Sequence, residues 1–188
     1  MNLHDLPVPS GADVAAMRGL FDAMHATTRR DPLVPREWRV ARLGALAALL
    51  GEEPDAWVQA IDTDFGHRSA HETRLAELFP ATEAVRHARR HVGTWMRPRS
   101  VSPSLWFRPG RARLIPQPLG VVGIVVPWNY PLLLALSPLA AALAAGNRVM
   151  IKMSEFTPRT GALLAQRVAK YFPDGSVAVV LGDAQVGA

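Results

Sequence analysis

The stretch at 123–155, GIVVPWNYPLLLALSPLAAALAAGNRVMIKMSE, decides the fold. It opens with β-branched residues that follow one another without a polar break, which is typical of a strand covered on both faces. The apolar run after Pro131 suits a buried helix that begins at a proline and ends at Gly146. A second strand then leads to Lys152. The stretch raises two questions: why the amide of Asn129 stands among prolines and aromatic residues, and why Lys152 closes the second strand.

The alternation of strand and helix continues around this stretch. We expect strands over 121–126, 149–152 and 177–181, separated by helices over 131–145 and 157–171. Right-handed crossovers place the strands in one parallel sheet. The predicted fold class is therefore α/β, with the start of a doubly wound parallel sheet.

The residues before Pro98 show helical periodicity. We expect helices over 14–24, 35–51, 57–66 and 69–96, with Pro80 kinking or restarting the last one. After Pro98, two short extended segments flank the turn at 108–111. The sequence thus divides into a helical N-terminal segment over 1–98, an extended hairpin over 99–118, and a βαβαβ unit over 119–188.

Composition restricts the function classes. The chain has 188 residues, a net charge of +5 and no cysteine. Its arginines are dispersed, so the clustered basic face that nucleic acids require is missing, and we expect no nucleic-acid partner. Without cysteine, these residues hold no disulfide, thiolate metal ligand or cysteine nucleophile. The N-terminal residues lack the basic start and apolar core of a signal peptide, so we expect a cytoplasmic location.

The region 114–147 contains no charged residue, which raises the alternative of a membrane-associated hairpin. A spanning helix needs about 20 continuous apolar residues. Prolines divide this region into shorter pieces: Pro116, Pro118, Pro127, Pro131 and Pro138. We therefore expect no membrane span.

Two pairs of histidines have the i, i+4 spacing of metal ligands on a helix: His67 with His71, and His87 with His91. No cysteine joins them, so we interpret them as solvated helix faces and expect no metal. Serine hydrolase chemistry has no support, because a G-x-S-x-G motif is missing. Four carboxylates are interpreted as surface charges in preference to an acid–base pair: Asp62, Asp64, Glu72 and Glu77.

In a parallel sheet, ligands gather beyond the carboxyl ends of the strands, where Asn129 and Lys152 both fall. The G-x-G-x-x-G fingerprint of dinucleotide-binding folds is absent, and PWNYP stands in its place. On spacing alone, Asn129 suits the N-cap of the following helix. Lys152 could be a solvated strand end, and Glu155 could be the acid near the start of the next helix.

The sequence at 118–155 resembles the start of the cofactor domain in aldehyde dehydrogenases. That family shows P-W-N-[FY]-P, then A-A-G-N, then K-x-S-E, and all three motifs stand here in this order. The similarity extends upstream through HVGTWMRP at 91–98. The segment DFGHRSAHETRLAELFPA at 64–81 is most similar to the coniferyl aldehyde dehydrogenase branch.

The resemblance implies a role for each site residue. Asn129 matches the amide that forms the oxyanion hole for the aldehyde oxygen, a role that an N-cap does not exclude. Lys152 and Glu155 match residues that contact the adenosine ribose, and the backbone near Val126 and Trp128 lines the cofactor cleft. The implied cofactor is NAD, with NADP possible. Glu155 favours NAD because its carboxylate repels a 2′-phosphate.

The implied activity is the oxidation of coniferyl-type aldehydes, aromatic or medium-chain, to carboxylic acids. In this family the reaction uses a cysteine thiolate and a glutamate base, and this sequence has no match to either motif or to the catalytic domain. We therefore expect an incomplete aldehyde dehydrogenase fold with a Rossmann-like sheet, inactive by itself.

The same resemblance bears on partners. The hairpin at 99–118 resembles part of the oligomerisation arm, and the full-length parent is expected to be a homo-oligomer, a dimer. An alternative function is a non-catalytic nucleotide-binding or scaffold remnant that pairs with a full-length dehydrogenase.

Overall fold

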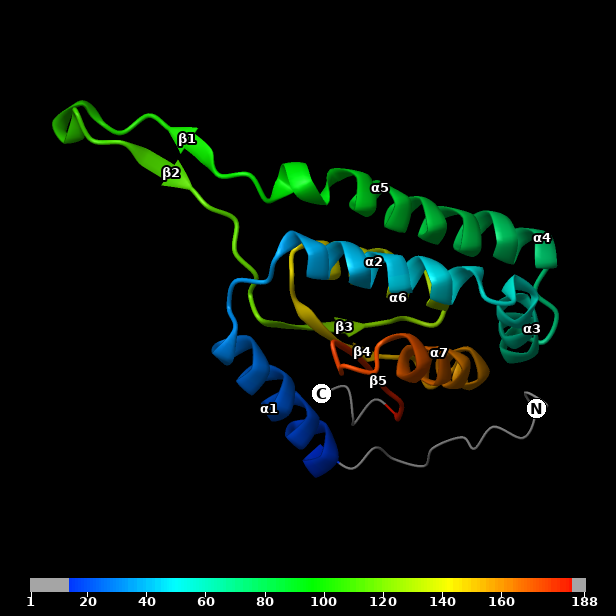
Figure 1. Ribbon diagram of the computed structural model, residues 1–188. Helices are drawn as coiled ribbons and strands as arrows, with labels where there is room; N and C mark the ends of the chain where they lie inside the picture. The colour runs from blue at the N-terminus through cyan, green and yellow to red at the C-terminus, as the bar shows by residue number, and fades with distance from the viewer. Residues whose placement is uncertain (1–13, 184–188) are drawn as a thin grey trace.

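The computed structural model describes residues 14–183 (Figure 1). Its elements follow in the order α1 (Val14–Arg30), α2 (Arg36–Gly51), α3 (Pro54–Phe65), α4 (Ala70–Thr73), the π-helix η2 (Arg74–Leu78), α5 (Phe79–Trp95), β1 (Arg99–Val101), the 3-10 helix η3 (Leu105–Phe107), β2 (Ala112–Leu114), β3 (Val121–Val125), α6 (Pro131–Ala144), β4 (Arg148–Lys152), α7 (Pro158–Tyr171) and β5 (Val177–Val180).

The predicted parallel sheet is confirmed. Its strands lie in the order β3-β4-β5, and both neighbouring pairs are parallel. In the register, Lys152 lies opposite Val125 on one side and Val180 on the other. All three strands therefore end at the same edge of the sheet, which is where the fold class predicts a ligand site.

Helices cover the sheet in layers. α6 and α7 pack against the strands, and α2, α3 and α5 pack in turn on these two helices. α1 contacts β3 and β4 and lies on the opposite side of the sheet from α2 and α5 (Figure 1). Trp57, Leu136 and Ile151 are fully buried in the core between these layers, and burying a side chain of this size stabilises the fold by about 1.5–3 kcal/mol.

The long helix predicted over 69–96 covers Ala70 to Trp95 as three consecutive helical elements, α4, η2 and α5. α5 begins at Phe79 with Pro80 in its first turn, as the expected restart requires, but the π turn of η2 just before it was not predicted. Proline removes one N–H donor and clashes with the carbonyl four residues earlier. A π turn replaces that local hydrogen-bonding pattern, so the helix continues past the proline.

The predicted pair of extended segments is present as an antiparallel hairpin of β1 and β2, which projects from the helical body (Figure 1). Its tip carries the exposed side chains of Leu105, Trp106 and Phe107. Between 14 and 183, none of the helices combines the length and apolar character that crossing a membrane demands.

Candidate active site

The loops that follow β3 and β4 start side by side at the carboxyl edge of the sheet. The Val126 N–H donates a 2.9 Å hydrogen bond to the carbonyl of Lys152, which joins the first residue of one loop to the last residue of β4. The β3 loop carries Trp128 and Asn129, and the β4 loop carries Glu155. The structure therefore gathers the five predicted site residues at one edge of the sheet, four on two adjacent loops and Lys152 at the end of β4.

The Asn129 side chain is exposed and makes no hydrogen bond within the described part of the chain. Its backbone carbonyl instead accepts a 2.8 Å bond from Nη1 of Arg68. The N-cap position of α6 belongs to Tyr130, without a side-chain capping bond. The N-cap interpretation of Asn129 is therefore wrong, and its amide remains available to a ligand.

Glu77 caps α6 in place of Asn129. Its Oε2 accepts hydrogen bonds of 2.7 Å from the Leu132 N–H and 3.3 Å from the Leu133 N–H. The position is favourable because the first N–H groups of a helix lack partners and carry a partial positive charge. Glu77 has no exposed surface, so its interpretation as a surface charge is wrong. Burial raises the pKa of this carboxyl, against the opposing effect of the two N–H bonds and of Arg68.

Arg68 connects Glu77 to the loop of Asn129. Its Nη1 lies 3.2 Å from Oε1 of Glu77, and its Nη2 lies 3.2 Å from Oε1 of Glu72. The guanidinium carbon lies 4.8 Å from the ring centroid of Phe65 and 4.6 Å from that of Tyr130. We call the buried pair of Arg68 and Glu77 the anchor. It fixes both the backbone of Asn129 and the start of α6.

A sharp turn between α3 and α4 aims Arg68 inward. Gly66 has φ 62° and His67 has φ 107°, both in the left-handed region that residues other than glycine rarely adopt. The spacing of His67 and His71 predicted a shared helix face. This prediction is wrong, because His67 lies in the turn before α4. His87 and His91 do lie on one face of α5, with their rings stacked 4.1 Å apart. Over residues 14–183, no cluster of three or more His, Cys, Asp or Glu side chains could hold a metal ion.

On the β4 loop, Nζ of Lys152 lies 3.3 Å from Oε2 of Glu155. Lys152 is half-buried and Glu155 is exposed. A hydrogen bond from its own backbone N–H, followed by the bond from Lys152, holds the pKa of Glu155 below its usual value. The pair therefore presents an ammonium and an ionised carboxylate to whatever binds at this edge.

Glu155 does not cap α7, although its place in the sequence allowed that role. The cap is Asp64 from α3, which accepts bonds of 2.9 Å from the Arg159 N–H and 2.8 Å from the Thr160 N–H. The Thr160 hydroxyl donates a further 2.8 Å bond to the same carboxylate. Partial burial raises the pKa of Asp64, and these bonds oppose that shift. The interpretation of Asp64 as a surface charge is therefore also wrong.

A hollow of about 390 Å³ opens between the two loops and α3. Its lining consists of Asp64, Phe65, Trp128, Phe156 and Thr157. Trp128 is half exposed, and its ring centroid lies 6.1 Å from that of Phe65. A hollow of this size suits a small ligand or one part of a cofactor.

Comparison with known proteins identifies the relatives of this chain. The sequence profile described as the aldehyde dehydrogenase family matches residues 9–188. A probable coniferyl aldehyde dehydrogenase of Pseudomonas aeruginosa is 48% identical over 178 residues, which are 95% of this chain and 37% of that protein. The coniferyl aldehyde dehydrogenase of Pseudomonas sp. HR199 is 45% identical over 152 residues, which are 81% of this chain and 31% of that protein. The chain thus spans about a third of these relatives.

Solved structures agree on the fold. A substrate-bound AldH of Staphylococcus aureus superposes with a TM-score of 0.85 at 24% identity, over 91% of this chain and 37% of that one. An aldehyde dehydrogenase of Brucella melitensis gives a TM-score of 0.81 at 22% identity, over 94% of this chain and 36% of that one. These matches confirm the predicted fold class and its incompleteness. The chain belongs to the aldehyde dehydrogenase family.

Proposed function

We propose that this chain forms the oxyanion-binding and adenosine-binding portion of an NAD-dependent aldehyde dehydrogenase that oxidises coniferyl-type aldehydes to carboxylic acids. The family match and the two coniferyl aldehyde dehydrogenase relatives support the reaction and the substrate class. One observation of the structure carries the proposal: the Asn129 amide is exposed and makes no hydrogen bond to any residue between 14 and 183, on a loop whose backbone is fixed by a buried ion pair.

The Asn129 amide stabilises the negative charge that develops on the aldehyde oxygen as a nucleophile adds to the carbonyl carbon. A neutral donor that is already in place bonds more strongly to this oxygen in the transition state than in the substrate. The anchor holds the Asn129 carbonyl through Arg68 and the start of α6 through Glu77. The loop therefore needs little reorganisation when the charge appears.

Lys152 and Glu155 fit the ribose of NAD. The Lys152 ammonium donates hydrogen bonds and the Glu155 carboxylate accepts them, which matches two neighbouring hydroxyl groups. The low pKa of Glu155 keeps it negative, and this charge disfavours the 2′-phosphate of NADP. The backbone near Val126 and Trp128 lines the same cleft. When bound, NAD accepts the hydride from the aldehyde carbon.

The nucleophile and the base lie outside these 188 residues, which contain no cysteine. The chain is therefore inactive by itself in this proposal. The hairpin of β1 and β2 is the part of an oligomerisation arm that pairs two subunits of a dimer, and its exposed tip residues are the contact surface. In this proposal the chain has three parts: the helical segment over 1–98, the arm over 99–118 and the cofactor-binding unit over 119–188.

The test begins with the reading frame beyond Ala188. A frame that continues into a cysteine motif supports the proposal, and its full product should form NADH from coniferyl aldehyde. In that product, Asn129→Ala should lower kcat by a factor of about 10²–10³ and leave the KM for NAD unchanged. Gln166→Ala, which removes an exposed amide from α7, is the control and should have no effect.

Two results would contradict this proposal. An unchanged kcat in Asn129→Ala would show that this amide does not stabilise the oxyanion. Turnover by the 188-residue chain alone would show that the nucleophile does not lie outside it. A frame that stops at Ala188, together with NAD binding and no turnover, would instead favour the non-catalytic remnant.

A further inference from the structure

A second hollow lies away from the two loops, between α2 on one side and η2 and α5 on the other, with a volume of about 880 Å³. Pockets that hold small molecules commonly measure about 300–1,000 Å³. The proposed function uses no residue of this groove. In Figure 1 the two helices that form its walls run side by side on the face of the molecule away from α1.

The floor of the groove is apolar. It is formed by Val40, Ala47, Leu50, Leu78 and Val85, all of which belong to the hydrophobic core or pack against it. Phe79 adds an aromatic ring that is 59% exposed. An apolar floor of this kind favours a ligand with an apolar body, because burying that body removes its surface from water.

The rim of the groove is strongly basic. It carries Arg36, Arg74, Arg86, Arg89 and Arg90, whereas Glu83 is the only acid among the described residues that line it. Arg86 pairs with Glu83, and Arg74 pairs with Asp55. The other three arginines make no ion pair within residues 14–183.

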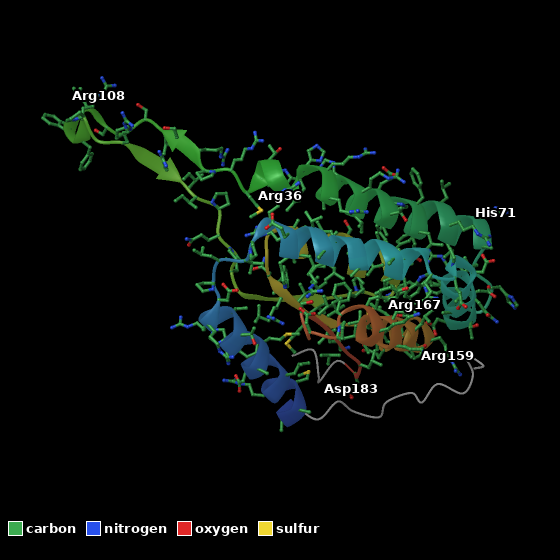
Figure 2. All side chains as sticks on the ribbon, in the orientation of Figure 1. Arg36, His71, Arg108, Arg159, Arg167 and Asp183 are labelled. Atoms are coloured by element: carbon green, nitrogen blue, oxygen red, sulfur yellow. The ribbon has the colours of Figure 1, made fainter. Side chains whose placement is uncertain are left out.

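Arg36 lies at the start of α2 and lines the groove. Its Nε lies 2.9 Å from the position that a Cβ would take at Gly93, so a glycine on α5 lets the guanidinium lie close to that helix. Figure 2 labels Arg36 at the start of α2, where it faces the last turns of α5. The π turn of η2, a geometry that often marks functional sites, contributes Arg74 and Leu78 to the same groove.

We propose that this groove binds an amphipathic anion, with its apolar body on the floor and a carboxylate or phosphate head on the free arginines. Guanidinium groups bind both heads through paired charge-assisted hydrogen bonds. A purely inorganic anion leaves the apolar floor unused, and a neutral apolar molecule leaves the guanidinium groups unpaired. Neither matches the groove as well as a molecule with both parts.

The test titrates the 188-residue chain with four molecules that share one alkyl body: octanoate, octyl phosphate, octanol and octyltrimethylammonium. Calorimetry and NMR chemical shifts are the readouts. Saturable binding of one anion, with shifts centred on η2 and α5 and at least about tenfold weaker binding of octanol, supports the proposal. The tighter of the two anions identifies the head group.

The decisive variant is Arg89→Gln with Arg90→Gln, which removes two exposed charges from the groove. It should weaken anion binding at least about tenfold. The matched control, Arg108→Gln with Arg111→Gln, removes the same charge from the arm and should leave binding unchanged. Equal losses in both variants, no loss in the groove variant, or equal binding of octanol and the anions would overturn the proposal. Circular dichroism checks that both variants fold.

Discussion

The loops after β3 and β4 each lead into a helix whose first N–H groups need a hydrogen-bond acceptor, and the two acceptors differ. Each connects a parallel strand to a helix with a proline in its first turn, Pro131 in α6 and Pro158 in α7. Neither helix is capped by its own loop. An acid from the N-terminal helices bonds to the first N–H groups in both cases, Glu77 at α6 and Asp64 at α7.

The two caps differ in burial and in charge. Glu77 is fully buried and paired with Arg68, whereas Asp64 is half-buried and bonds mainly to backbone N–H groups and a hydroxyl. Removing one member of a buried ion pair is far more costly than removing a partly exposed cap. The loop that carries the catalytic amide of our proposal is thus held more firmly than the loop that carries the ribose contacts.

The largest expected effect comes from breaking the anchor. Arg68→Met leaves the Glu77 carboxylate buried without its cation and should lower the free energy of unfolding by about 3–5 kcal/mol. Urea denaturation measures this change.

Arg74→Met is the matched control for this variant. Arg74 pairs with Asp55 through side chains that are 48% and 86% exposed. Its loss should cost less than about 1 kcal/mol. If the two variants lose equal stability, the anchor has no special role in holding the fold.

The second cap should have an intermediate effect. Asp64→Ala removes the acceptor for two first-turn N–H groups of α7 and should cost about 1–2 kcal/mol. Asp62→Ala, two residues earlier on α3, is the control, because within the described residues Asp62 makes no bond to the start of α7. A loss in Asp64→Ala as large as that in Arg68→Met would remove the difference between the two loops.

The sequence predicted the fold well because its signals are local. Prolines, glycines and the switch between strand and helix periodicity located the elements of the βαβαβ unit, and the right-handed crossover rule supplied the parallel order. The π turn before Pro80 was missed. Nothing in the residues themselves distinguishes a π turn from the kink that a proline usually produces.

The site was predicted in part. Motif spacing located Asn129 and Lys152 at the carboxyl ends of adjacent strands, but it did not locate the acids that cap the helices after them, because both acids come from distant helices. A signal for Glu77 did exist: it stands four residues before Ala81 and eight before Val85, on the stripe that becomes buried. An acid on such a stripe needs a partner. Tertiary contact alone shows that the partners are Arg68 and the start of α6.

The pH dependence of the free energy of unfolding tests the burial of Glu77, in which the cap of α6 differs from the cap of α7. Burial raises the folded pKa above the ordinary value of 4.5, so the folded chain binds this proton more tightly than the unfolded chain. The resulting stability is fully present below pH 4.5 and is lost as pH rises through the folded pKa. The free energy of unfolding should therefore fall with rising pH more steeply in the wild type than in Glu77→Gln. Parallel profiles would contradict the raised pKa.

The smallest expected effect on stability comes from the pair of Lys152, at the end of β4, and Glu155, on the loop that follows. Lys152→Gln breaks the contact with Glu155, but the Glu155 carboxylate that remains is exposed and keeps the bond from its own backbone N–H, so no charge is left buried without a partner. The urea midpoint should move less than in Asp64→Ala, and the residual shift should vanish in about 1 M salt, where the screening length is only about 3 Å. The same variant should weaken NAD binding if Lys152 contacts the ribose, so stability and binding separate at this residue. A shift in midpoint equal to that of Asp64→Ala would instead make Lys152 a structural residue.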